Sequence, residues 1–304
     1  MSDYTKEIKV ENHVAKQKNG VIFQISQFFL LLRPYSWIKN LFIFVPLFFA
    51  RDFFDHAKLT TVFMAFVIFC ITASSVYILN DIFDREQDRK HQTKKNRPLA
   101  SGTISVKSAM VLLSCLLVID IYLIYFFVPQ IFWFMGLYFI LNIAYSMRLK
   151  HLAIIDILLV SSFYFIRIMV GGIAAGVSVS HWLLLCIIFA SLFLIIGKRL
   201  AELSQDNKRV VLEEYTPLFL NSILIISATL VIISYSLYSV LVLNSDLAMF
   251  SIFLVLLGII RYLFLVFTTH NAEYPEKAIV KDKIIFASSI LWVIAMYFII
   301  YLHF

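Results

Sequence analysis

The sequence predicts an all-α, polytopic membrane protein in which nine transmembrane helices surround a polar cavity that faces the cytoplasm. Of the 304 residues, 61% are hydrophobic and only 15% are charged, whereas about 25% of the residues of a soluble domain are charged. The apolar stretches are near-continuous and about 20 residues long, which is the length of a helix that crosses a bilayer. They lack the two-residue alternation of a membrane β-barrel.

The expected spans follow one another along the chain at residues 23–50, 60–79, 106–126, 131–147, 153–175, 182–200, 216–242, 247–267 and 284–302. The first span is irregular, because Arg33 and Pro34 interrupt its front half and proline is tolerated better at the start of a helix than inside it. We therefore expect an interfacial helix first and entry into the membrane near Trp37. The polar residues 1–20 are predicted to form a flexible tail, and residues 21–304 a single domain.

Lysine and arginine residues predict the orientation. Twenty-two of the 26 lie within residues 1–39 or on alternate loops, and only Arg51 and Lys58 lie on the opposite loops. Because positive charge marks the cytoplasmic side of a membrane protein, we expect the amino terminus and the polar cavity inside and the carboxyl terminus outside. The net charge of +7 then reflects topology and attraction to anionic lipids. Since no soluble basic domain is present, we expect no nucleic-acid partner.

The acidic motif at the end of the second span is the most informative stretch. Asp81, Asp84 and Asp88 lie at positions i, i+3 and i+7, which share one face of a helix. Clustered carboxylates repel one another unless a cation lies between them, and an all-oxygen ligand set favours Mg²⁺ bound together with a phosphate group. Lys94 and Arg97 follow and add positive charge. The pattern predicts a metal–diphosphate site at the membrane surface; the alternative is a solvated, charged loop.

Two charged residues lie on the fifth predicted span. A charge inside the membrane is costly, so Arg167 is expected to face a cavity and to meet a substrate phosphate or a carboxylate there; the alternative is a packing salt bridge to another helix. Asp156 is eleven residues earlier, about 16 Å along a helix, which is too far for a direct pair. Each residue therefore needs another partner. Asn142 and Tyr145, near the end of the fourth span, either line the cavity or pack.

A second charged loop follows the sixth span. Its charged side chains lie close to one helical face: Lys198, Arg199, Glu202 and Asp206. This loop and the loop with the acidic motif both follow a span and both carry mixed charges. We therefore expect the two loops to close over one polar cavity.

A resemblance to a known family rests on the motif Asn80-Asp81-x-x-Asp84-x-x-x-Asp88, followed by Lys94 and Arg97-Pro98. It resembles the first acidic motif of the UbiA-type membrane prenyltransferase superfamily, whose ordinary members join an aromatic acceptor to a polyprenyl diphosphate. Those members carry a second aspartate-rich motif after the sixth span, where this chain has Lys198 and Arg199 instead. Two aspartate motifs suit two Mg²⁺ ions on one diphosphate, whereas a Lys-Arg pair suits an additional phosphate.

Further motifs resemble the decaprenyl-phosphate phosphoribosyltransferase branch of that superfamily: Arg33-Pro34, Lys39-Asn40, Tyr145-Ser146, Lys150-His151, Asp156-Ile157, Arg167 with Gly171-Gly172, and Gly197-Lys198-Arg199. The resemblance covers roughly residues 28–300. It implies a bacterial plasma-membrane glycosyltransferase that uses Mg²⁺, with phosphoribosyl pyrophosphate as donor and a polyprenyl phosphate as acceptor. The product would be a precursor of lipid-linked pentose donors for cell-wall glycans.

The resemblance also implies residue roles. Asp81, Asp84 and Asp88 are expected to be catalytic and to hold the Mg²⁺. Substrate-binding roles fall to a larger set: Lys39, Asn40, Asn80, Lys94, Arg97, Tyr145, Lys150, Asp156, Arg167, Lys198, Arg199 and Glu202.

Two other functions stay open. One is an aromatic-acid or quinone-precursor polyprenyltransferase of the same fold, against which the altered second motif counts. The other is a transporter, which would place paired charges and broken helices near the midplane rather than at one membrane face. The sequence leaves a homo-oligomer open.

Overall fold

The structure is a computed structural model that describes residues 20–92, 94–203, 210–269 and 281–302. Within these ranges it has nine helical segments that are long and apolar enough to cross a membrane: Phe23–Phe49, His56–Phe83, Val106–Phe127, Pro129–Met147, Ile155–Ala175, His181–Leu203, Pro217–Leu243, Asp246–Thr268 and Lys283–Tyr301. Each predicted span overlaps one of them, so the predicted fold class is confirmed. The predicted tail lies outside the described residues except for Gly20.

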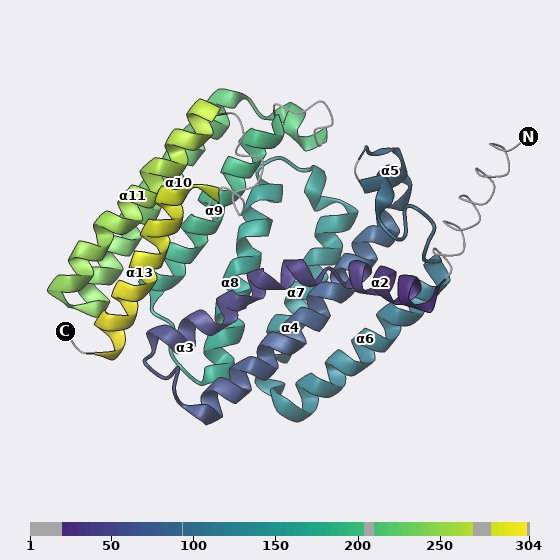
Figure 1. Cartoon of the computed structure of the whole chain (residues 1–304), viewed down its shortest axis with the longest axis horizontal. Coiled ribbons are helices and arrows are strands. Elements are labelled where there is room, and N and C mark those ends of the chain that lie inside the picture. The colour runs from purple at the N-terminus through teal and green to yellow at the C-terminus, as the bar shows by residue number, and fades with distance from the viewer. Residues whose placement is uncertain (1–19, 93, 204–209, 270–280, 303–304) are drawn as a thin grey trace, which may run out of the picture.

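Seven helices form most of the bundle in Figure 1: α4 (His56–Phe83), α6 (Val106–Phe127), α7 (Phe132–Met147), α8 (Ile155–Ala175), α9 (His181–Leu203), α10 (Pro217–Tyr238) and α11 (Asp246–Thr269). The last long helix, α13 (Lys283–Tyr301), packs along α11. Shorter segments connect them: α5 (Arg85–Lys90), η2 (Lys94–Asn96), η3 (Pro129–Ile131), η4 (Leu149–His151), η5 (Val210–Glu214) and η6 (Ser239–Leu243).

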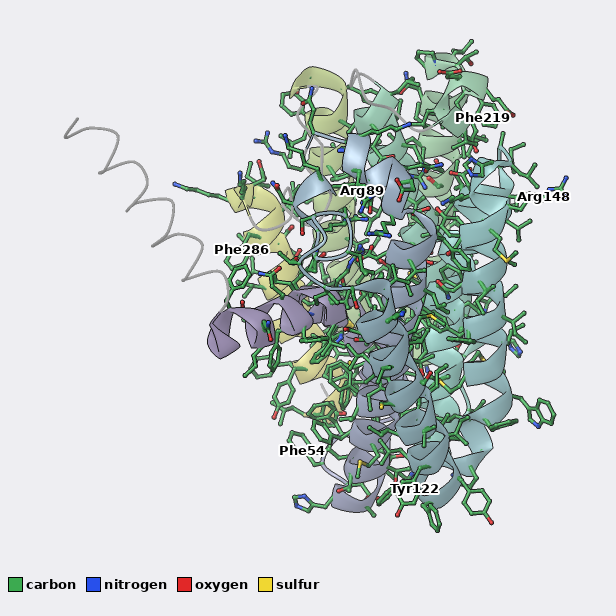
Figure 2. The ribbon with its side chains drawn as sticks, turned by 90° about the vertical axis from the view of Figure 1, so that its right-hand side faces the viewer. Phe54, Arg89, Tyr122, Arg148, Phe219 and Phe286 are labelled. Carbon is green, nitrogen blue, oxygen red and sulfur yellow. The ribbon has the colours of Figure 1, made fainter. Side chains whose placement is uncertain are left out.

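The first span is broken where the Arg33-Pro34 pair predicts a break. Helix α2 (Val21–Leu32) ends at Arg33, whose φ of 51° is left-handed, and the tighter helix η1 (Pro34–Phe44) then leads into α3 (Val45–Phe49). Helix α2 is the purple helix that runs across the direction of the long helices in Figure 2. An apolar helix that runs across the direction of the transmembrane helices, as α2 does, suits a membrane interface, as the sequence predicts.

Side-chain caps mark the starts of several long helices. The carboxylate of Asp55 accepts hydrogen bonds from the backbone N–H groups of Ala57 and Lys58 at 2.9 and 3.2 Å, which fixes the start of α4. Ser105 caps α6 and Thr216 caps α10 in the same way. Such caps satisfy amide groups that the first turn of a helix leaves without partners. They explain why α4 begins earlier than the apolar stretch alone predicts.

The interior is packed in two main clusters, while the outer surface is apolar. One cluster centres on Phe69, Tyr138 and Phe163 of α4, α7 and α8. The other joins α9, α10 and α11. Large apolar side chains also point outward, with Trp133 81% exposed and Tyr125 71% exposed. An exposed apolar surface over helices of this length fits lipid contact rather than water.

Candidate active site

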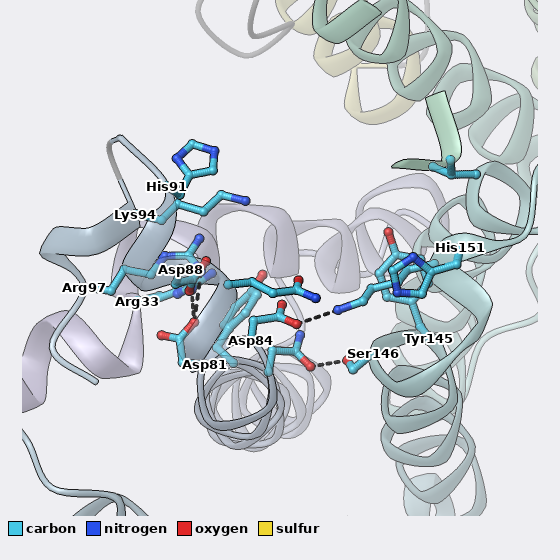
Figure 3. Close-up of a pocket in the computed structure, with 15 residues that line it drawn as sticks. Arg33, Asp81, Asp84, Asp88, His91, Lys94, Arg97, Tyr145, Ser146 and His151 are labelled. Atoms are coloured by element: carbon cyan, nitrogen blue, oxygen red, sulfur yellow. Dashed lines mark hydrogen bonds and ion pairs between the residues drawn. The ribbon is translucent and has the colours of Figure 1, made fainter. Parts of the chain in front are cut away.

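The acidic motif lies at a helix junction rather than on one continuous helix. Helix α4 ends at Phe83, Asp84 forms the junction, and α5 carries Asp88. The expectation that the three carboxylates share one unbroken helical face is therefore wrong at Asp84. All three still line a single cavity of about 380 Å³, together with Asn80. In Figure 3 the acidic motif forms one wall of this cavity, and the end of α7 with η4 forms the opposite wall.

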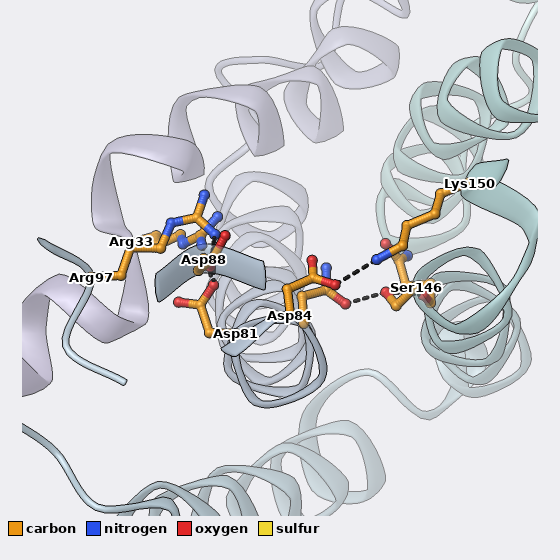
Figure 4. A network of polar contacts seen from close by, with 9 residues as sticks. Arg33, Asp81, Asp84, Asp88, Arg97, Ser146 and Lys150 are labelled. Carbon is orange, nitrogen blue, oxygen red and sulfur yellow. Dashed lines mark hydrogen bonds and ion pairs between the residues drawn. The ribbon is translucent and has the colours of Figure 1, made fainter. Parts of the chain in front are cut away.

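Cationic side chains bind each of the three carboxylates. The guanidinium of Arg33 donates to Asp81, and Arg97 donates to both Asp81, at 3.2 Å, and Asp88, at 2.6 Å. Across the cavity, the Lys150 ammonium donates to Asp84 at 2.5 Å. Figure 4 shows these arginine and lysine contacts. Asp81 and Asp88 are 2% and 4% exposed. Burial of carboxylates at this level requires counter-ions, which the arginines supply.

The ion pairs divide the motif into two parts. Asp81 and Asp88 share Arg97, whereas Asp84 turns toward Lys150. Among the residues that the structure describes, no three His, Cys, Asp or Glu side chains are grouped as ligands of a metal ion. The donor chemistry nevertheless fits Mg²⁺, because three carboxylates and an amide line one cavity and Mg²⁺ prefers oxygen ligands. The metal site stays a prediction, and it requires the cations to leave the carboxylates.

The cavity contains part of the predicted substrate-binding set: Asn80, Lys94, Arg97, Tyr145 and Lys150. It also contains residues to which the sequence assigned no role: Arg33, Tyr77, Gln87, His91, Ser146, His151 and Val211. Tyr77 precedes Asp81 by four positions, so helical spacing is a signal that points to it. Arg33, Ser146 and His151 adjoin predicted residues within the quoted motifs. Nothing in the sequence signals Val211.

His91 stands at the rim of the acidic wall. Its pKa is lowered, first by burial and then by the neighbouring Lys94 and Arg97 charges, which outweigh the effect of Asp88. The imidazole is therefore neutral near pH 7, since even an unperturbed histidine has a pKa of about 6.5. Asn80, on the same wall, accepts a hydrogen bond from the Ser146 hydroxyl of the opposite wall, which joins the end of α4 to the end of α7.

The charged residues of the second loop form a separate buried network. Arg199 donates from Nε to Asp156 at 3.0 Å and from Nη1 to Glu202 at 2.8 Å. The hydroxyl of Tyr215 donates to the other oxygen of Asp156 at 2.7 Å. Asp156 is 0% exposed and Arg199 3% exposed, and neither lines the cavity. The structure thus brings these three predicted residues together, but behind the cavity wall. Asp206 lies outside the described residues.

Arg167 is also buried, and neutral groups surround it. It donates to the Asn40 amide oxygen at 2.9 Å, to the Phe163 carbonyl at 2.9 Å and to the Tyr138 hydroxyl at 3.4 Å. Aromatic rings of α4, α7 and α8 face its guanidinium, an arrangement that stabilises a desolvated cation. The prediction that Arg167 and Asp156 have separate partners is confirmed. Arg167 does not line the cavity, and its partners hold η1 against α8.

Three further predictions have simple outcomes. Asn142 is buried and donates to the Tyr138 carbonyl at 2.7 Å, so of the two roles left open for it the structure shows packing. Lys39 on η1 and Lys198 on α9 each precede a residue of the two buried networks and do not line the cavity. Their substrate-binding roles stay predictions.

The fold and the site define a polytopic membrane protein with a cavity of carboxylates and cations at one end of its helices. The UbiA prenyltransferase family is matched over residues 40–290. The chain belongs to this family, as the acidic motif and its flanking residues predict.

Similar proteins agree with this placement. The chain is 34% identical over 290 residues to a protein of Corynebacterium glutamicum named decaprenyl-phosphate phosphoribosyltransferase, covering 89% of this chain and 86% of that protein. It is 37% identical over 217 residues to a protein of the same name from Mycolicibacterium smegmatis, covering 68% of each. A UbiA homologue from Archaeoglobus fulgidus, solved with dimethylallyl diphosphate and Mg²⁺, superimposes with a TM-score of 0.70 at 18% identity, covering 90% of this chain and 99% of that one. This likeness shows the fold.

Proposed function

We propose that the protein transfers a 5-phosphoribosyl group from phosphoribosyl pyrophosphate to a polyprenyl phosphate and releases pyrophosphate, at a step that supplies lipid-linked pentose for cell-wall glycans. The observation that carries the proposal is the composition of the cavity. Three carboxylates and four cationic side chains, Arg33, Lys94, Arg97 and Lys150, line it. A donor with a pyrophosphate and a second phosphate requires both kinds of group. The names of the bacterial relatives support the same assignment.

The acidic wall would receive the leaving group. Asp81, Asp84 and Asp88 would hold Mg²⁺, which neutralises the charge that develops on the departing pyrophosphate. In this structure Arg97 donates to Asp81 and Asp88, and Lys150 donates to Asp84. Once Mg²⁺ binds these carboxylates, both cations would be free to donate to phosphate oxygens. Hydrogen bonds from arginine to phosphate are charge-assisted and about twice as strong as neutral ones. The side chains that stabilise the carboxylates in this structure would therefore bind the phosphates of phosphoribosyl pyrophosphate.

The acceptor requires positioning rather than activation. A polyprenyl phosphate is already an anion at neutral pH, so its oxygen attacks the ribose carbon without a strong general base. Holding the two reactants in line supplies much of the rate, because it replaces an encounter in solution by an intramolecular geometry. A carboxylate of the acidic wall would stabilise positive charge on the ribose carbon as the pyrophosphate leaves, as in other sugar transfers.

The cavity would face the cytoplasm, with the carboxyl terminus outside. Arg89 and Arg148 lie at one end of the bundle in Figure 2, and Phe54 lies at the other. The last turn of α13 is at the Phe54 end, because the Tyr301 hydroxyl donates to the Phe48 carbonyl at 2.8 Å. The cavity and the helix end therefore lie on opposite faces. Positive charge concentrated at the cavity end supports the cytoplasmic assignment.

The proposal is tested with purified protein in detergent. Pyrophosphate should be released from phosphoribosyl pyrophosphate only when Mg²⁺ and a polyprenyl phosphate are both present, and a chelator should stop the release. Asp81→Asn should abolish turnover, because it removes a ligand of the leaving group. Prenylation of an aromatic acid from a polyprenyl diphosphate, without release of pyrophosphate from the ribose donor, would overturn the proposal in favour of ordinary prenyl transfer.

A further inference from the structure

The connection between α7 and α8 contains a strained turn directly behind the cavity wall. Ile154 has φ 69° and ψ −46°, and the backbone N–H of Ile155 donates to the carbonyl of Ala153 at 2.8 Å. These values describe a γ-turn of the rare, strained form. A β-branched residue pays a particular penalty at positive φ, and such strain persists only where surrounding contacts hold it.

The contact that holds the turn comes from a distant part of the chain. The hydroxyl of Tyr215 accepts a hydrogen bond from the backbone N–H of Ile154 and donates one to the carboxylate of Asp156. Asp156 is fixed in turn by Arg199. Burial and the bond to Asp156 raise the pKa of Tyr215, so the hydroxyl keeps its proton and stays a donor. One phenol therefore connects the central residue of the strained turn with Asp156, the residue that follows the turn.

The same turn presents cavity residues. Lys150 and His151 belong to η4, which ends three residues before Ile154, and both line the cavity. On the other side, Val211 of η5 lines the cavity and lies four residues before Tyr215. The network thus joins η4 and η5, the two segments that complete the wall opposite the acidic motif. Its Arg199 also lies within electrostatic reach of Tyr145, another lining residue.

We propose that Tyr215 is a positioning residue: its hydroxyl holds the strained turn at Ile154 so that Lys150 reaches Asp84 and the ribose donor across the cavity. This inference rests on the proposed function for its kinetic part only. It also gives the second charged loop a role different from phosphate binding, because Arg199 and its carboxylate partners orient the phenol.

The test replaces Tyr215 by Phe, which keeps the ring and its stacking on Phe219 but removes the hydroxyl. Loss of one buried hydrogen-bonding group should raise the KM for phosphoribosyl pyrophosphate about tenfold and change kcat much less. Tyr235→Phe is the matched control. Its hydroxyl is also buried and hydrogen-bonded, to Ser251 at 2.6 Å and Trp292 at 2.7 Å, but it is remote from the cavity, so this variant should lose stability without a change in KM.

A second variant separates positioning from general stability. Ile154→Gly relieves the positive-φ strain, since glycine adopts that region freely, and it should restore a near-normal KM in the Tyr215→Phe background. Failure of this rescue, or an unchanged KM in Tyr215→Phe, would overturn the inference.

A measurement that needs no turnover completes the design. Nitroxide labels at Lys90→Cys and Arg148→Cys, both exposed positions, report the distance between the acidic wall and the α7 end, in a background with Cys115→Ser. The distance distribution should broaden in Tyr215→Phe and stay narrow in Tyr235→Phe. Equal widths in the two variants would contradict the proposal that the Tyr215 hydroxyl holds the turn at Ile154. If the unaltered protein releases no pyrophosphate, the proposed function fails, while the distance measurement still decides the role of Tyr215.

Discussion

Lys150→Met is expected to change metal affinity and donor affinity in opposite directions. The Lys150 ammonium donates to Asp84 at 2.5 Å, and the two side chains are 17% and 30% exposed. A hydrogen bond between charged groups contributes about 1.5–3 kcal/mol, and partial exposure places this pair near the lower value. A difference of about 1.4 kcal/mol is tenfold in a binding constant. Without Lys150, Asp84 should therefore bind a divalent cation about tenfold more tightly in the absence of donor.

The assay measures Mn²⁺ binding by the loss of its free-ion electron paramagnetic resonance signal, followed by the KM for phosphoribosyl pyrophosphate. The KM should rise by a similar factor, because the variant lacks a cation that would bind a donor phosphate. Lys58→Met is the matched control, since Lys58 donates to Asp52 at the same 2.5 Å but at the opposite face. It should alter neither quantity. Weaker or unchanged Mn²⁺ binding in Lys150→Met would refute the exchange of Asp84 between lysine and metal.

Two further predictions concern stability, measured by thermal unfolding in detergent. Gly171→Ala should destabilise the fold by about 2 kcal/mol or more, because a Cβ would lie 2.0 Å from the carbonyl oxygen of Ile43. Gly136→Ala is the control and should be tolerated, because nothing lies within 4 Å of a Cβ there. Equal melting temperatures of the two variants would contradict this packing. The pKa of Asp282 is lowered, chiefly by its hydrogen bond from Arg261. Its stabilising contribution is therefore complete above about pH 4 and is lost as the pH falls further, so Arg261→Gln should flatten the loss of stability in this range, and an unchanged slope would rule out the pair as its source.

The spans were predictable because lipid imposes a simple rule. A helix that satisfies its own backbone is required wherever about 20 apolar residues cross the bilayer, and the nine segments follow from that rule. The break at Arg33 was predictable for an equally local reason, since proline cannot continue a regular helix. The start of α4 at His56 was not predictable in this way, because the first turn after the cap at Asp55 is polar and the apolar stretch begins only beyond Lys58.

The site was predictable where its residues lie close together in the sequence. Asp81 and Asp88 lie within one stretch of sequence, and spacing alone places both near one cavity. The partners of Arg199 and Arg167 depend on which helices pack together, and a single sequence carries no record of that packing. Arg199 was predicted to meet a phosphate, yet Asp156 and Glu202 already bind it. A cationic motif thus indicates an anion, but the anion is in this case a carboxylate of the chain itself.

The cavity couples stability to function through its charges. Asp81 and Asp88 are buried, and buried carboxylates require counter-ions, so Arg33 and Arg97 are needed for the fold before any substrate arrives. Under the proposed function, a polyanionic donor that brings its own cation would supply the replacement charge for the carboxylates and would accept hydrogen bonds from the released guanidinium groups. Removal of Arg97 alone should therefore lower both the melting temperature and the donor affinity, whereas removal of Lys150, which pairs with the more exposed Asp84, should lower chiefly the affinity.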